Sequence, residues 1–169
     1  LSTARLEMHK ITCEGQNLEF ELRSRPLSSM SKKIILEIMK RKTAFYTVFT
    51  PIRYGMIIAN KDESIEKVKE ACINIGIAFQ IRDDILDLTV PKESERGEAT
   101  LTKQQFGKPW AGDLEEGKRT LVLYHVYTNA TKSEKKRLEK MIDKIRKLAL
   151  RRDKLAKEGK AYEKIANKI

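Results

Sequence analysis

The stretch that decides the fold is FQIRDDILD, which occupies residues 79–87. It lies in an apolar run that begins near Ala71, contains no proline and has Gly76 as its single helix-breaking residue. A long run of this composition, without strong breakers, predicts a buried helix. We expect the helix to extend from an N-cap at Ser64 to about Thr89, shortly before Pro91.

Three carboxylates fall at one end of this helix. Asp83 and Asp87 are one turn apart, about 40° around the axis, and Asp84 lies beside them. Like charges at this spacing repel one another, and burying them without partners is costly. One hypothesis is that they bind a hard cation such as Mg²⁺, shared with a substrate phosphate. The alternative is a solvated helix end, at which Arg82 and nearby lysines neutralise the acids.

Length and composition favour one globular, all-α domain over residues 1–169. The chain is 40% apolar and 35% charged, and its four prolines and eight glycines leave long stretches free for helices. We find no segment with the length and apolarity of a membrane span and no signal peptide. Because the sequence opens at Leu1, inside an expected helix, we expect a fragment or a processed product.

The cysteines and the net charge narrow the choice of compartment and partner. Cys13 and Cys72 lack metal-ligand spacing, so we interpret them as small buried residues in a reducing compartment, the cytoplasm. The formal charge of +11 is compatible with nucleic-acid binding. Against that hypothesis, Lys and Arg alternate with Asp and Glu along most expected helices, and no base-reading motif is present.

The remaining helices are placed by apolar periodicity and by capping residues. The first is expected near residues 3–23, ended by Pro26. We expect the second helix to begin after serines 28, 29 and 31 and to be followed by a solvated basic turn at residues 40–42. Farther along, we expect a helix kinked by Pro51, close packing at Gly15 and Gly55, a polar loop over residues 90–117, a helix at residues 121–130 and a charged amphipathic helix capped by Ser133.

Three further segments carry a family resemblance. They are CEGQNLE at residues 13–19, KTAFY at residues 42–46 and FGKPWAGDLEEGKRT at residues 106–120. In this order, and with FQIRDDILD between the second and the third, they resemble the trans-prenyltransferases of the polyprenyl synthetase family. That family makes farnesyl and geranylgeranyl diphosphate from allylic diphosphate and isopentenyl diphosphate.

The resemblance implies a fold and a set of site residues. It implies the C-terminal half of an all-α isoprenoid synthase bundle, without the family's first aspartate-rich motif. It assigns Mg²⁺ to Asp83, Asp84 and Asp87, and the diphosphates to Lys42, Lys108 and Lys118. It also implies that Thr43, Tyr46 and Gln80 present oxygen dipoles to the allylic cation, and that Phe79 packs near the isopentenyl substrate.

Three hypotheses follow for function. The first is that the chain is part of an isoprenyl diphosphate synthase and is nearly inactive alone. It would then act as a homo-oligomer or together with a complementary N-terminal half. The second is a non-catalytic partner or regulatory subunit of a prenyltransferase, and the third is the basic nucleic-acid binder. Under the first hypothesis, a bundle split at this point leaves apolar faces uncovered, including the face with Ile75 and Phe79.

Overall fold

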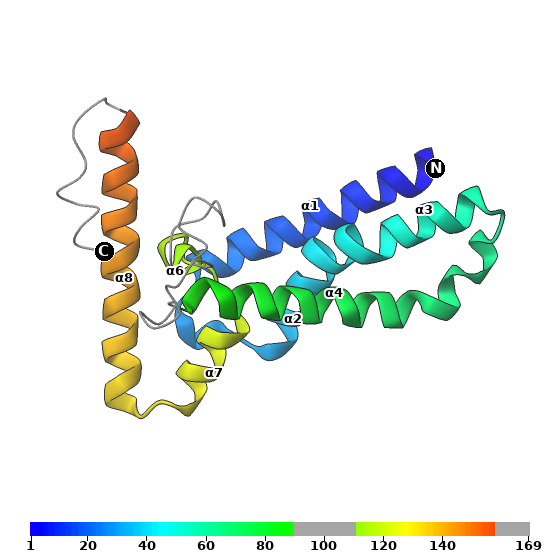
Figure 1. The fold of residues 1–169 in the computed structure, drawn as a ribbon. Helices are drawn as coiled ribbons and strands as arrows, with labels where there is room; N and C mark the ends of the chain where they lie inside the picture. Colours follow the sequence, from blue (N-terminus) through cyan, green and yellow to red (C-terminus); the bar gives the residue numbers. More distant parts are fainter. Residues whose placement is uncertain (90–110, 158–169) are drawn as a thin grey trace, which may run out of the picture. The chain divides into compact units, whose positions relative to one another are not determined.

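The computed structural model describes residues 1–89 and 111–157, and within these ranges it contains helices and no strand. The all-α prediction is therefore confirmed. In chain order (Figure 1) the elements are α1 (Ser2–Ser24), the 3₁₀ turn η1 (Leu27–Ser29), α2 (Lys32–Met39), the π-helix η2 (Lys40–Phe49), α3 (Thr50–Ile58), the 3₁₀ turn η3 (Asp62–Ser64), α4 (Ile65–Leu88), α6 (Gly112–Glu115), α7 (Leu121–Asn129) and α8 (Lys132–Lys157).

The chain forms two compact units. Unit 1 comprises Leu1–Asp84 and Arg119–Tyr124, and unit 2 comprises Ile85–Lys118 and His125–Ile169. The boundary between the units crosses α4 near its C-terminal end, and it crosses α7 as well. We describe each unit by itself, and the expectation of a single domain stays a prediction.

The first helices begin and end where the sequence predicts. α1 ends at Ser24, two residues before Pro26, because proline cannot donate the hydrogen bond that the next turn requires. α2 begins after Ser31, whose hydroxyl accepts a hydrogen bond from the Ile34 N–H at 3.2 Å. Ser31 is thus the N-cap among the three candidate serines.

The basic turn expected at residues 40–42 is wrong, because these residues begin the π-helix η2. This element continues from α2 into α3 without a break. Its wide turns come directly before Pro51, whose ring would clash with the Thr47 carbonyl in a regular α-helix. π-helical turns are frequent at functional sites.

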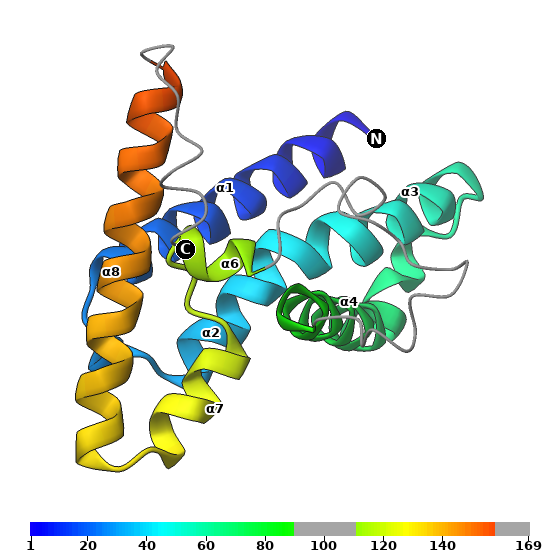
Figure 2. The ribbon, with the colours of Figure 1, turned by 60° about the vertical axis from the view of Figure 1, so that its left-hand side comes forward.

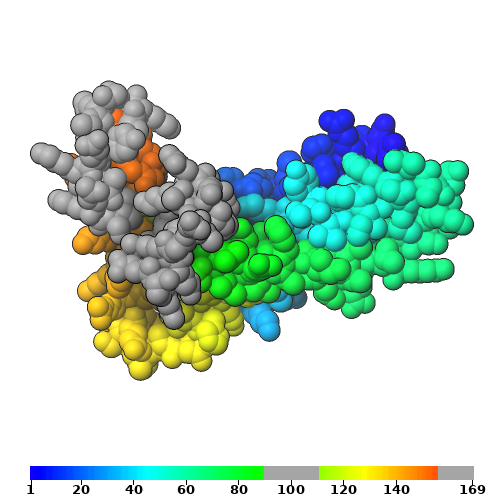
Figure 3. All heavy atoms as spheres, viewed as in Figure 1, coloured from blue at the N-terminus to red at the C-terminus, as the bar shows by residue number. Residues whose placement is uncertain are grey.

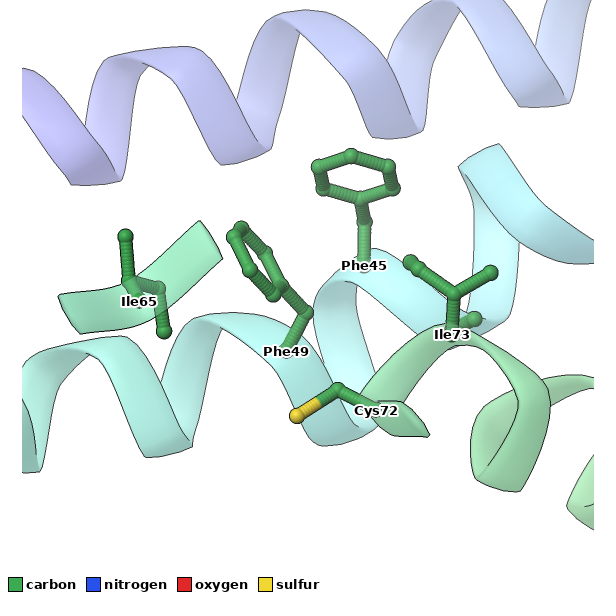
Figure 4. Packing of buried hydrophobic residues seen from close by; sticks show 6 residues of the cluster. Phe45, Phe49, Ile65, Cys72 and Ile73 are labelled. Atoms are coloured by element: carbon green, nitrogen blue, oxygen red, sulfur yellow. The ribbon is translucent and has the colours of Figure 1, made fainter. Parts of the chain in front are cut away.

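The core of unit 1 lies between η2 and α4. Figure 4 shows the Phe45 ring pointing from η2 toward the pale-blue helix α1. Phe45 and Phe49 form an edge-to-face pair at 5.1 Å between ring centroids. Around them the buried cluster contains Ala44, Ile65, Cys72 and Ile73. Cys72 is buried, as predicted, but the same prediction is wrong for Cys13, which is exposed.

Glycines let the helices of unit 1 approach closely. A Cβ at Gly15 would lie 2.7 Å from the Lys42 backbone nitrogen, so the close packing predicted there is confirmed. A Cβ at Gly76 would lie 2.5 Å from the Ala44 Cα, which joins α4 to η2. The same prediction is wrong at Gly55, where no atom lies within 4 Å, because that side of α3 faces open space.

The first turn of α8, in unit 2, is capped by Thr131, and the predicted cap at Ser133 is wrong. The Thr131 hydroxyl oxygen accepts from the Glu134 N–H at 3.3 Å, and the Glu134 carboxylate accepts from the Thr131 N–H at 2.8 Å. This reciprocal pair is a capping box, which requires an acidic or amide side chain three residues after the cap. Thr131 meets that requirement through Glu134, and Ser133 does not because Lys136 follows it.

This cap leads to a first prediction. We expect Thr131→Ala to lower the hydrogen-exchange protection of the first-turn amides of α8 about fivefold, because it removes a capping interaction worth about 1 kcal/mol. Ser133→Ala, two residues away, is the matched control and should leave that protection unchanged. Equal losses in the two variants would contradict the assignment of Thr131 as the cap.

Within the part of the chain that the structure describes, no helix combines the length and apolarity needed to cross a bilayer.

Candidate functional site

Three of the residues singled out by the resemblance are linked in unit 1. The Thr43 hydroxyl donates to the Gln80 side-chain oxygen at 2.7 Å, and the Gln80 side-chain nitrogen donates to Asp84 Oδ1 at 2.8 Å. Asp84 is buried, with 4% of its surface exposed. The link joins η2 to α4 one turn beyond the close approach of Gly76 and Ala44. The fold therefore connects a hydroxyl, an amide and a carboxylate that are far apart in sequence.

Lys42 is held by a buried carboxylate from α1. Glu19 accepts a hydrogen bond from the Lys42 ammonium on one oxygen and from Arg23 Nη2 at 2.8 Å on the other. Burial favours a raised pKa for Glu19, but the bonds from Arg23 and Lys42 outweigh it and lower that pKa below its ordinary value of 4.5. Glu19 therefore stays ionised and orients the Lys42 side chain.

Sequence reasoning did not give Glu19 a role. The signal was its place at the end of the CEGQNLE segment, one helical turn after Gly15. Gly15 packs against the backbone of Arg41 and Lys42, so a carboxylate one turn later on α1 comes within reach of Lys42.

In unit 2, Asp87 anchors the segment that carries Lys118. Asp87 Oδ2 accepts from the Asp113 N–H at 3.1 Å, and its backbone oxygen accepts from the Ala111 N–H at 2.9 Å. These bonds hold the start of the short helix α6, so the expectation of loop throughout residues 90–117 is wrong at Gly112–Glu115. Asp87 thus has a structural task in addition to its predicted role as a metal ligand.

Lys118 is paired with the acids of this segment. Its ammonium donates to Asp113 Oδ1 at 2.6 Å and lies 3.3 Å from Glu116 Oε2. Burial favours a lowered pKa for Lys118, but the hydrogen bond to Asp113 outweighs it and raises that pKa above 10.5. Lys118 therefore carries its positive charge at any physiological pH. Lys108 lies outside the described residues.

Three further predicted residues of unit 1 are exposed, and Asp83 is half-buried. Tyr46, Ile75 and Phe79 have 58%, 59% and 56% of their surface accessible. The prediction that Ile75 and Phe79 lie on an uncovered apolar face is confirmed. Figure 3 shows atoms of α3, in cyan, and of α4, in green, together on the surface of unit 1. Large apolar side chains at the surface next to polar site residues are typical of a face that receives a ligand or a partner.

The acids of α4 fit one kind of magnesium site and not another. Among residues 1–89 and 111–157, no three His, Cys, Asp or Glu side chains are close enough to hold a metal ion. A protein-only cage therefore does not fit. Mg²⁺ is usually bound by one or two carboxylates together with phosphate oxygens and water. Asp83 and Asp84, consecutive residues near the end of α4, supply the one or two carboxylates that this shared arrangement requires.

Comparison of the sequence with known proteins gives consistent matches. Residues 3–158 match the family model described as Polyprenyl synthetase. A geranylfarnesyl diphosphate synthase from Natronomonas pharaonis is 33% identical over 113 residues, which cover 67% of this chain and 29% of the relative. A geranylgeranyl diphosphate synthase from Saccharolobus solfataricus is 31% identical over 127 residues, which cover 75% of this chain and 34% of the relative.

A solved structure agrees with the sequence matches. The geranylgeranyl pyrophosphate synthetase from Pyrococcus horikoshii superposes with a TM-score of 0.63 and 27% identity, over 98% of this chain and 47% of that chain. The present chain thus spans about a third of the length of the curated relatives it matches and under half of the solved synthetase. Because the family pattern extends over residues 3–158, this chain belongs to the polyprenyl synthetase family.

Proposed function

We propose that this chain is a region of an isoprenyl diphosphate synthase, which condenses isopentenyl diphosphate with an allylic diphosphate. One observation carries the proposal. The hydrogen-bonded chain from Thr43 through Gln80 to Asp84 begins next to Lys42, a lysine that Glu19 orients. The arrangement combines a cation for a leaving diphosphate with oxygen dipoles for a developing carbocation. The names of the relatives support the same reaction.

Each residue of this arrangement has a defined task in the proposed reaction. Lys42 stabilises the negative charge that develops on the departing diphosphate. The Thr43 hydroxyl donates a hydrogen bond to the Gln80 side-chain oxygen, which leaves the hydroxyl lone pairs to face the electron-poor allylic carbon. Tyr46 adds a further oxygen dipole, and the exposed ring of Phe79 packs against the isopentenyl chain.

The proposal includes a magnesium site and further diphosphate contacts. Asp83 and Asp84, with Asp87, would hold Mg²⁺, which would supply positive charge to the diphosphate. Lys108 and Lys118 are the further lysines of the proposed diphosphate site. The complete enzyme is proposed to be cytoplasmic and to form either as a homo-oligomer or with a complementary N-terminal half.

A second candidate function rests on unit 2. Asp87 and Lys118 both make contacts with Asp113, and the chain spans about a third of its curated relatives. Because these acids and lysines pair with one another within unit 2, they are compatible with a chain that is a non-catalytic partner of a prenyltransferase. The two candidate functions predict different results when the chain binds a complementary N-terminal half. The synthase makes product, and the non-catalytic partner does not.

The experiment is co-expression of this chain with the N-terminal half of the Saccharolobus solfataricus synthase, followed by a radiolabelled isopentenyl diphosphate assay. We expect product from the complex, almost none from the chain alone, and none after magnesium is removed. Lys42→Met should lower turnover about 100-fold, because it removes charge that acts on the transition state. Lys40→Met, two residues away, is the matched control and should change turnover by less than about twofold.

Two results would contradict the proposal. If Lys42→Met and Asp84→Asn complexes turn over like the unsubstituted complex, the proposed site is wrong. If the complex forms and remains inactive, the non-catalytic function is favoured.

A further inference from the structure

The charges of α8 are sorted by face. The helix carries twelve Lys or Arg and four Asp or Glu residues. At 100° per residue, an arc of about 80° holds six basic residues and no acid, and Asp143 borders this arc. All six are exposed, and they extend for about 27 Å along the helix. We call them the basic face: Lys136, Lys140, Lys144, Lys147, Arg151 and Lys154.

The basic face has little internal compensation. Among the described residues, Lys147 is its one member with a carboxylate within 4.0 Å, that of Asp143 at 3.1 Å. Some bases elsewhere in the chain are paired, as Arg53 is with Glu7 at 2.7 Å and with Asp62 at 3.2 Å. Like charges three or four residues apart destabilise a helix. A linear array of cations, five of the six without a carboxylate of the described residues within 4.0 Å, therefore fits a partner that supplies dense negative charge.

Apolar side chains border the basic face on both sides. Met141 and Leu150 have 50% and 62% of their surface exposed, and on the helix they flank the basic arc. Figure 2 shows α8 beside the end of α7, where Val126 is also 50% exposed. An apolar recess of about 370 Å³ lies between Met141 and Val126. A basic recess of about 480 Å³ lies on the other side of Met141 and is lined by Lys136, Lys140 and Lys144.

We propose that the basic face of α8, with Met141 and Leu150, binds the surface of an anionic lipid bilayer. In this proposal the row of cations meets the phosphate headgroups, and Met141 and Leu150, at the two opposite edges of the row, lie at the headgroup level. A nucleic-acid backbone takes up cations but leaves the bordering apolar side chains without a role. Single strands also require aromatic stacking, and α8 contains no aromatic residue. This proposal does not depend on the proposed enzymatic function.

The test is co-sedimentation of the purified full chain with lipid vesicles. We expect binding to phosphatidylcholine vesicles that contain phosphatidylglycerol, release by high salt, and no binding to pure phosphatidylcholine. Changing Lys140, Lys144 and Arg151 to Gln should lower the partition coefficient about 100-fold, because each cation near an anionic surface contributes about fivefold. The matched control changes Lys10, Lys61 and Lys67 to Gln. These exposed lysines of unit 1 give the same change in net charge, and their loss should lower partition by less than about threefold.

A second variant tests the apolar contribution. Met141→Ser combined with Leu150→Ser keeps every charge and should weaken partition about tenfold. If binding were purely electrostatic, the partition coefficient of this variant would equal that of the original chain.

Three results would overturn the proposal. The first is equal partition of the basic-face variant and its control. The second is full partition of the double Ser variant. The third is binding to a DNA duplex that is lost in the basic-face variant, without binding to the anionic vesicles. In each case we would compare variants of equal helicity by circular dichroism, so that misfolding is not mistaken for lost affinity.

Discussion

Gly76→Ala is expected to lower the free energy of unfolding of unit 1 by about 3 kcal/mol. The added methyl would lie 2.5 Å from both the Cα and the Cβ of Ala44, and Ala44 is fully buried. Since the contact includes backbone of η2, no side-chain rotation can relieve it, and α4 must move away. That movement would loosen the packing of Phe45 and Phe49 and stretch the hydrogen bond from Thr43 to Gln80.

Gly55→Ala provides the matched control. Gly55 lies in α3 with no atom within 4 Å of a Cβ, so the same substitution should stabilise by about 0.5–1 kcal/mol. Urea denaturation followed by circular dichroism gives both values. Similar changes for the two variants would show that the contact between α4 and η2 is not what makes Gly76 necessary.

Glu19→Gln is expected to destabilise the chain by about 3 kcal/mol at neutral pH, because it breaks a buried ionic cluster from one side. The Glu19 side chain is 8% exposed, and the Arg23 and Lys42 side chains that it pairs are 15% and 29% exposed. A neutral amide removes the countercharge that Glu19 supplies to both cations in a poorly solvated position. Double-mutant cycles with Lys42→Met would show how much of the loss comes from this pair.

The loss should depend on pH in a defined direction. The folded pKa of Glu19 is lowered from 4.5, so its stabilisation is fully present above pH 4.5 and is lost as pH falls through the folded pKa. The original chain should therefore lose more stability on acidification than Glu19→Gln, and the two unfolding free energies should converge in acid. Urea midpoints measured across this range would test the convergence, and parallel curves would contradict the ionised state of Glu19.

Glu21→Gln is the control for this effect. Glu21 lies two residues away on α1 and pairs with Arg25 at 3.3 Å, with side chains 62% and 55% exposed. Solvent screens such a pair, so we expect a change of less than about 0.5 kcal/mol.

The local features of α1 and α4 could be predicted because the signals that encode them are close in sequence. Pro26 ends one helix, and the apolar run around Cys72 and Ile73 forms the other. The cap of α8 was equally local, but the prediction chose Ser133 over Thr131 because it did not weigh the Glu134 side chain. The error at this cap therefore came from a local sequence signal that was overlooked, and no long-range contact caused it.

By itself, the sequence determined the all-α class, because helix periodicity is a property of neighbouring residues. The order of its motifs also singled out Lys42, Thr43, Gln80 and Asp84 as predicted site residues. Tertiary structure alone decided what these groups touch. Glu19 meets Lys42 across 23 positions of sequence and Thr43 meets Gln80 across 37, distances over which no periodicity extends. The approach of η2 to α1 and to α4, which Gly15 and Gly76 permit by carrying no side chain, brings these groups into contact.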